Sequence, residues 1–117
     1  MTGISHIRAC GLTQIILSEY GGMPAIRAVG VFADRRGQFR KLGVTGEADV
    51  QSLMPDGRYC GVEVKTGTGR LSKSQRLWRD AFLKRNGVYI LAHWKGDLDG
   101  SETIRSALES VGYARRS

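Results

Sequence analysis

The chain has 117 residues, a formal net charge of +7 and ordinary shares of hydrophobic (41%) and charged (25%) residues. This length predicts a single domain over residues 1–117 with one hydrophobic core. No apolar run approaches the ~18 residues of a membrane helix, no leader pattern is visible at the N-terminus, and two cysteines are too few for a disulfide framework. We therefore expect a cytoplasmic protein without a membrane partner. The basic charge indicates a polyanionic partner, although a basic protein with no such partner is an open alternative.

The N-terminal segment predicts a helix. Apolar residues at positions 4, 7, 12, 15, 16 and 20 recur mostly at helical spacing. We expect the helix to cover residues 4–20 and to end at the pair Gly21-Gly22. Gly11 weakens the first turns, which leaves a start nearer Thr13 open.

Short strands with turn residues between them follow this helix. The runs of β-branched and aromatic residues predict strands over residues 26–32, 39–42, 50–54 and 59–65. A basic turn is expected at residues 35–37, between the first two strands.

The second half of the chain alternates between helical and strand patterns. Ser72 and Gln75 form an S-x-x-Q capping box, which opens a helix over residues 72–86 that Gly87 closes. A strand buried on both faces is expected at 88–92, a loop at 97–100 and an amphipathic helix at 104–111. This order predicts an α/β fold with a mixed sheet flanked by helices.

The turn Pro55-Asp56-Gly57 sets the register of the hairpin in the middle of the chain. A three-residue loop with glycine in the left-handed position pairs Met54 with Arg58. Counting back places Asp49 opposite Glu63. A four-residue loop would instead move Asp49 to the other face of the sheet.

With the three-residue loop, two carboxylates and an amine share one face of the sheet, because Lys65 lies two residues after Glu63. Carboxylates this close repel unless a cation lies between them. Mg²⁺ or Mn²⁺ suits oxygen ligands, and the Val64 carbonyl is a further candidate ligand. Lys65 would then orient a water or stabilise charge on a phosphate. The alternative is a solvent-facing strand on which Lys65 merely balances two acids.

The stretch "GEAD…PDGRYCGVEVKTGTGRLSKSQ" resembles the VRR-NUC domain, a branch of the PD-(D/E)xK nuclease superfamily. "GVTGEAD" is similar to the family's G-x-x-G-x-x-D, "GVEVK" to its E-V-K, and "GRLSKSQ" to the S-x-x-Q that opens the next helix. "RAVGVF" is similar to its Arg-containing strand. The resemblance covers residues 27–93, and the small stand-alone members, often from phages, are nearest in size.

The resemblance implies a restriction-endonuclease-like fold and metal-dependent hydrolysis of DNA phosphodiesters. It assigns Asp49 and Glu63 to the metal, with Mg²⁺ or Mn²⁺ as cofactor, Lys65 to catalysis and Gln75 to arranging the site. It also implies a homodimer that cuts branched DNA such as four-way (Holliday) junctions, in a bacterial or phage-infected cell.

One departure from the family concerns the first helix, which usually carries a glutamate at the metal site. Only Gln14 and Glu19 are candidates here, and the sequence does not choose between them. Two alternatives therefore stay open: a DNA-binding module with weak or no cleavage, and a nuclease for flaps or nicks. His6 and His93 are interpreted as structural, because the metal and Lys65 already account for activating water.

Basic residues surround the predicted site in sequence. Candidate contacts to nucleic acid are Arg27, Arg70, Lys73 and Arg76. The alternatives are a solvated helix face and a plain flexible connector at residues 66–70. On the predicted helix, one arc is expected to be buried, namely Leu77, Trp78, Ala81 and Phe82.

Overall fold

A computed structural model describes residues 3–27, 31–33, 39–41 and 45–116, and for residues 31–33 and 39–41 it describes the backbone alone. The elements are, in chain order, α1 (His6–Glu19), β1 (Met23–Ile26), β2 (Val31–Ala33), β3 (Phe39–Lys41), β4 (Val50–Leu53), β5 (Tyr59–Thr66), α2 (Lys73–Lys84), β6 (Val88–Trp94) and α3 (Asp97–Ser110). Within the described ranges, no helix is long and apolar enough to cross a membrane.

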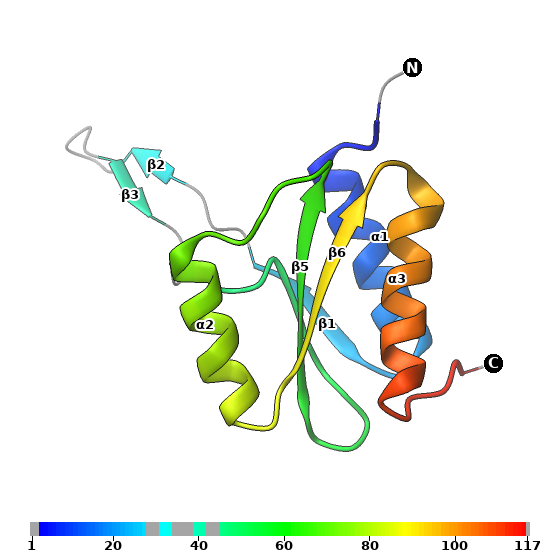
Figure 1. Cartoon of the computed structure of the whole chain (residues 1–117). Helices are drawn as coiled ribbons and strands as arrows, with labels where there is room; N and C mark the ends of the chain where they lie inside the picture. The colour runs from blue at the N-terminus through cyan, green and yellow to red at the C-terminus, as the bar shows by residue number, and fades with distance from the viewer. Residues whose placement is uncertain (1–2, 28–30, 34–38, 42–44, 117) are drawn as a thin grey trace.

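The main sheet has four strands in the order β1-β4-β5-β6. β1 pairs antiparallel with β4 and β4 with β5, whereas β5 and β6 are parallel. Helices α1 and α3 lie together on one side of this sheet and α2 on the other (Figure 1). β2 and β3 form a separate antiparallel pair. The mixed, helix-flanked sheet that the sequence predicts is confirmed.

The hydrophobic core lies between the sheet and the helices α1 and α3. The even-numbered residues of β5 point into it, because side chains alternate along a strand. Buried core residues from the strands and both helices are Leu17, Val50, Cys60, Val62, Val64, Trp94, Ile104 and Leu108. The odd-numbered residues of β5 therefore face the side that carries α2.

The predicted hairpin register is confirmed. The Met54 amide donates to the Arg58 carbonyl at 2.9 Å, and Gly57 adopts φ +87°. Glycine occupies this left-handed position without the steric cost of a Cβ atom. The pairing then runs back to Val50 opposite Val62, so the next positions in register are Asp49 and Glu63.

Two predicted elements in the first part of the chain are corrected. The strand expected at 26–32 is wrong: β1 spans Met23–Ile26 and β2 Val31–Ala33, while residues 28–30 lie outside the described residues. β1 starts one residue after the glycine pair because it hydrogen-bonds to β4, a long-range pairing that no local pattern reveals. Helix α1 begins at His6, capped by the Ser5 hydroxyl, and continues through Gly11. The basic turn at 35–37 lies outside the described residues.

The second half needs two smaller corrections. The loop expected at 97–100 is the first turn of α3. Asp99 accepts hydrogen bonds from the Lys95 and Gly96 amides there, and acidic side chains favour a helix N-terminus. Helix α2 ends at Lys84, and Asn86, with φ 64°, takes the left-handed position before Gly87.

Gly46 offers a test of how closely α2 packs on the loop before β4. It has φ +85°, and a Cβ atom there would lie 2.4 Å from the Ser74 carbonyl oxygen at the start of α2. We expect Gly46→Ala to lower the free energy of unfolding by roughly 1–3 kcal/mol or more, measured by urea denaturation. The control is Gly11→Ala, where a Cβ atom meets nothing within 4 Å and helix propensity predicts a gain of about 0.5–1 kcal/mol. Equal effects would contradict the close approach.

Candidate active site

Three side chains that the sequence singles out meet where β5 faces the start of α2. The Gln75 amide nitrogen donates to Glu63 Oε2 at 3.0 Å, and Lys65 Nζ donates to Gln75 Oε1 at 3.1 Å. Lys65 Nζ also lies 3.6 Å from Glu63 Oε2. The carboxylate, the amine and the carboxamide therefore form one connected group.

The capping box explains why Gln75 points at the strand. The Ser72 hydroxyl accepts from the Gln75 amide of the main chain at 3.2 Å, and the Gln75 side-chain oxygen accepts from the Ser72 amide at 2.8 Å. These reciprocal bonds satisfy amides that a helix N-terminus leaves unpaired. The same oxygen also accepts the hydrogen bond from Lys65 Nζ, so the helix cap fixes the position of the Lys65 amine.

Asp49 joins this group from the residue before β4. Its Oδ2 accepts a hydrogen bond from the Val64 amide at 2.8 Å. Because the N–H and C=O of one strand residue point to the same neighbour, the Val64 carbonyl is directed toward the Asp49 side as well. The register and this bond place the two predicted carboxylates next to each other.

Glu63 is only 2% exposed. Burial, and after it the negative charge of Asp49, raises the pKa of the Glu63 carboxyl to about 8. The Lys65 ammonium offsets part of this rise. A buried carboxyl with a raised pKa beside a second carboxylate is a common mark of a functional site.

The donor set fits a divalent cation. Glu63 Oε1 is buried and has no hydrogen-bond partner in the described part of the chain, although buried polar atoms are normally paired. Glu63, Asp49 and the Val64 carbonyl are the oxygen ligands that Mg²⁺ or Mn²⁺ prefers. Among the described residues, no three His, Cys, Asp or Glu side chains are already grouped as a metal site. Waters would complete the coordination.

Neither of the two predicted helix residues joins the site. Glu19 pairs with Arg105 at 2.7 Å and with Arg115 at 3.3 Å, both in the C-terminal part of the chain. Gln14 borders the same shallow hollow as Glu19. The first turn of α1 reaches the carboxylates, and at 1.5 Å per residue Gln14 lies about 12 Å and Glu19 about 20 Å further along the axis.

The structure also shows contacts beside the site that are not predicted from the sequence, and a pair formed by Arg27 and Glu47, which is buried on the loop before β4. His6 Nε2 lies 3.5 Å from Asp49 Oδ2. The Cys10 thiol lies 3.8 Å from His6 Nδ1. Glu47 is 7% exposed and faces Arg27, whose Nε lies 3.4 Å from Glu47 Oε1. The i, i+4 spacing of His6 and Cys10 was a usable signal, since such residues share a helix face.

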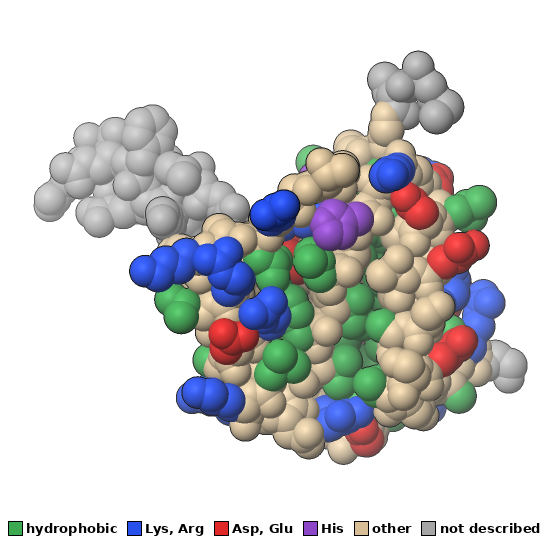
Figure 2. Space-filling view, in the orientation of Figure 1, with side chains coloured by type: hydrophobic (Ala, Val, Ile, Leu, Met, Phe, Trp, Pro, Cys, Tyr) green, Lys and Arg blue, Asp and Glu red, His purple; other side chains and the backbone are tan. Residues whose placement is uncertain are grey.

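The predicted nucleic-acid contacts divide into two groups. Arg70 and Arg76 line one hollow of about 400 Å³, together with Gly69 and His93. His93 bonds to the Gly69 carbonyl at 2.8 Å, which fixes the loop after β5 and agrees with a structural role. Lysine and arginine side chains gather over α2 in the space-filling view (Figure 2), where Lys73 occupies the first turn. Arg27 differs from these in that its guanidinium is paired with Glu47, while its amide donates to the Asp49 carbonyl at 2.6 Å.

The arc of α2 expected to be buried is only half covered. Trp78 and Phe82 stack with ring centroids 4.6 Å apart and are half-buried against the sheet. Leu77 is 61% exposed, and Ala81 is exposed as well. The expectation fails for these two because α2 touches the sheet along the narrow line of its two aromatic rings.

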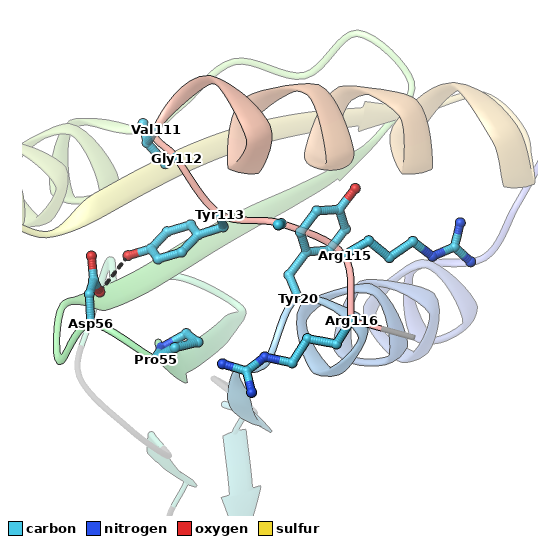
Figure 3. A pocket seen from close by; sticks show the side chains of 9 residues that line it. Tyr20, Pro55, Asp56, Val111, Gly112, Tyr113, Arg115 and Arg116 are labelled. Carbon is cyan, nitrogen blue, oxygen red and sulfur yellow. Dashed lines mark hydrogen bonds between the residues drawn. The ribbon is translucent and has the colours of Figure 1, made fainter.

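Another hollow, of about 410 Å³, is lined by the C-terminal tail, the end of α1 and the hairpin turn (Figure 3). Neither Asp49 nor Glu63 lines it. Tyr113 donates to Asp56 Oδ1 at 2.8 Å, and the Arg116 amide donates to the Glu19 carbonyl at 2.7 Å. These bonds hold the tail against α1 and the hairpin turn. We assign this hollow to packing of the tail.

Comparison with known proteins supports the fold. A solved structure described as a VRR_NUC domain superposes with a TM-score of 0.58 at 17% identity, over 87% of this chain and 91% of that chain. The chain thus has the fold of a VRR_NUC domain, and its resemblance to that family is confirmed at the level of fold.

The sequence comparisons say less about the chain than the structural comparison does. No family model matches the chain. A curated protein, glycogen synthase of Rhodopseudomonas palustris (strain HaA2), is 29% identical over 92 residues, which cover 78% of this chain and 19% of that protein. The chain therefore spans about a fifth of that relative's length.

The Glu63 environment makes stability depend on pH when metal is removed. Between about 4.5 and about 8 the folded protein retains a proton on Glu63 that the unfolded chain releases. Folding then binds a proton, so the free energy of unfolding falls as pH rises through this window. We expect urea denaturation in EDTA to show this fall for the wild type and a flatter profile for Glu63→Gln. Parallel profiles for the two proteins would contradict the buried, protonated carboxyl.

Proposed function

We propose that this protein is a metal-dependent deoxyribonuclease that hydrolyses DNA phosphodiester bonds. One observation carries the proposal: Glu63 is buried beside Asp49 with an oxygen that has no hydrogen-bond partner among the described residues, and Gln75 bonds its other oxygen and Lys65. In a purely structural ion pair this oxygen would be expected to have a partner. Burying a charged oxygen without one costs several kcal/mol of desolvation. The VRR_NUC fold supports the same chemistry by analogy.

Each residue has a separate role in the proposed reaction. Asp49, Glu63 and the Val64 carbonyl would hold Mg²⁺ or Mn²⁺. The ion would lower the pKa of a bound water and supply positive charge to stabilise the phosphate. Lys65 would orient the attacking water and stabilise negative charge developing on the phosphoryl oxygens. Gln75 holds the Lys65 amine at 3.1 Å, so the amine is positioned before DNA binds.

The net charge of +7 supports a polyanionic substrate. Arg70 and Arg76 border a hollow beside the loop that follows the catalytic strand, and Lys73 precedes Gln75 by two residues. These side chains would bind the DNA backbone. Arg27 is a weaker candidate, because its guanidinium already faces Glu47.

The preferred substrate is proposed to be branched DNA such as a four-way junction, cut by a homodimer with one site for each strand. A cytoplasmic, bacterial or phage setting follows from the same resemblance. The second candidate is a DNA-binding module with weak or no cleavage, or a nuclease for flaps or nicks. One observation favours the binding module: within the described residues, no third acidic side chain is grouped with Asp49 and Glu63.

Cleavage of labelled DNA tests the chemistry and the substrate together. A four-way junction, a flap, a splayed duplex and a linear duplex of matched sequence would each be incubated with Mg²⁺, Mn²⁺ or EDTA. We expect metal-dependent cutting of the junction and a rate loss of roughly 100-fold or more for Lys65→Ala. The variant should still bind DNA and unfold at the wild-type urea concentration.

The outcomes separate the candidates. Equal cutting of all four substrates would retain the hydrolysis and remove the preference for branches. Tight binding without cutting in either metal would support the binding module. Light scattering at micromolar concentration tests the homodimer, and a monomeric mass would contradict it.

Lys73 and Lys84 form a matched pair for testing where DNA lies on α2. Both belong to this helix, and 11 residues at 1.5 Å separate them by about 16 Å along its axis. We expect Lys73→Ala to weaken binding of every DNA substrate alike and to reduce the slope of log affinity against log salt by about 1. Lys84→Ala, at the end remote from Gln75, should leave both nearly unchanged. A larger loss of DNA binding in Lys84→Ala than in Lys73→Ala would contradict a DNA path over the first turn of α2.

A further inference from the structure

An aromatic side chain of α2 lies beside the carboxylates on the same face of β5. Gly61 precedes Glu63 by two residues on this strand, so the two positions share a face and lie about 7 Å apart. A Cβ atom on Gly61 would lie 3.4 Å from Trp78 Cζ3. The indole of Trp78 is therefore seated over the bare backbone at Gly61, next to the buried carboxylate.

Trp78 belongs to a row of three rings that reaches the solvent. It stacks on Phe82 with ring centroids 4.6 Å apart and an interplanar angle of 19°. The Tyr59 ring lies 6.1 Å from Phe82, and Tyr59 is 44% exposed. Trp78 and Phe82 are themselves only half-buried. Part of this aromatic surface is thus open on the flank of α2.

A hollow of about 220 Å³ opens along these rings. It is lined by Trp78, Ala81, Phe82 and Arg85. The small side chain of Ala81 leaves a notch in the helix surface, and Arg85 Nη1 donates to the Ala81 carbonyl at 2.8 Å, which holds the guanidinium at this notch. The hollow is smaller than the ~300–1,000 Å³ pockets of drug-sized ligands. It therefore suits a single flat ring packed against the indole and the guanidinium.

The chemistry of the lining favours an unpaired nucleobase as this ring. Aromatic rings and guanidinium groups both stack on base faces, and the lining found within the described chain includes one cation and no acid. A base in a duplex has both faces covered by its neighbours, so only an unpaired base can enter. At 1.5 Å per residue, Ala81 lies about 9 Å from Gln75 along α2. A strand whose base lies in the hollow can therefore place its backbone at the carboxylates.

We propose that this hollow binds an unpaired nucleobase of the DNA strand that enters the site. The inference rests on the proposed function in that DNA is the ligand, and it specifies how a branch is recognised. Extruding a paired base costs energy that an already unpaired base does not require. The protein should therefore bind a splayed duplex, with its unpaired arms, more tightly than a linear duplex of equal length.

Filling the hollow tests this inference without removing an aromatic ring. Ala81 is exposed and leucine is a strong helix former, so Ala81→Leu should unfold at the wild-type urea concentration. We expect its affinity for the splayed duplex, measured in EDTA, to fall by roughly 10-fold, as for the loss of one stacked base. Its affinity for the linear duplex should not change. A variant that binds the splayed duplex as tightly as the wild type would overturn the inference.

Arg85→Gln and Lys84→Gln give a matched pair for the charge. Both residues are exposed and adjacent at the end of α2, and of the two only Arg85 lines the hollow. We expect Arg85→Gln to weaken binding of the splayed duplex more than of the linear duplex, and Lys84→Gln to leave both nearly unchanged. With 5-iodouracil in an unpaired arm, irradiation should cross-link the DNA to Trp78 or Phe82. A cross-link mapped to another part of the chain would contradict the hollow as the binding site.

The proposed hydrolysis and the base-binding hollow can fail separately. If the wild type cuts DNA in Mn²⁺ while Ala81→Leu binds and cross-links as the wild type does, the nuclease stands and the hollow has no role. If Ala81→Leu loses the preference for the splayed duplex but the wild type cuts nothing in either metal, the hollow stands and the hydrolysis fails. A wild type without affinity for any DNA substrate overturns both.

A protein contact is the competing use of the hollow. In that case Ala81→Leu would convert a dimeric wild type into a monomer, as seen by light scattering, and would leave the affinity for DNA unchanged. That result would assign the hollow to contact between two copies of the chain and overturn the inference.

Discussion

The carboxamide of Gln75 is the interaction on which the site depends. Its oxygen accepts from the Ser72 amide and from Lys65 Nζ, and its nitrogen donates to Glu63 Oε2. One side chain therefore closes the cap of α2, fixes the Lys65 amine and binds a carboxylate of β5. Glutamate would also close the cap, yet it would place a third negative charge beside Glu63 and Asp49. The amide meets both demands, because it carries an acceptor and a donor without charge.

The helix and the strand can approach this closely because the surrounding chain permits it. Gly46 passes under the first turn of α2 with no room for a Cβ atom. On the other side of β5 the alternate residues Val62 and Val64 are buried in the core, which holds Glu63 in the opposite direction. The two faces of β5 thus have different roles: Val62 and Val64 pack in the core, and Glu63 and Lys65 face the site. Burial of Glu63 raises its pKa, and Oε1 has no hydrogen-bond partner within the described ranges; a cation between the carboxylates would relieve both.

Local sequence signals were sufficient for most of this arrangement. The Pro55-Asp56-Gly57 turn set the register that faces Asp49 toward Glu63, and the S-x-x-Q box placed Gln75 on the first turn of α2. Both depend on contacts within a few residues. The position of β1 could not be predicted, because it is set by pairing with residues 24 to 30 positions further along the chain. The contact of His6 with Asp49 could not be predicted for a similar reason: it arises from how α1 packs against the sheet, which no local pattern encodes.

The most direct test of the account is to locate the metal. Crystals of the wild-type protein soaked in Mn²⁺ and measured at a wavelength where manganese scatters anomalously would show the ion without any assumption about activity. We expect one strong peak between the carboxylates of Asp49 and Glu63, within bonding distance of Glu63 Oε1, with Lys65 still bonded to Gln75. A well-ordered site that stays empty at saturating Mn²⁺, or a peak bound elsewhere on the chain, would contradict it.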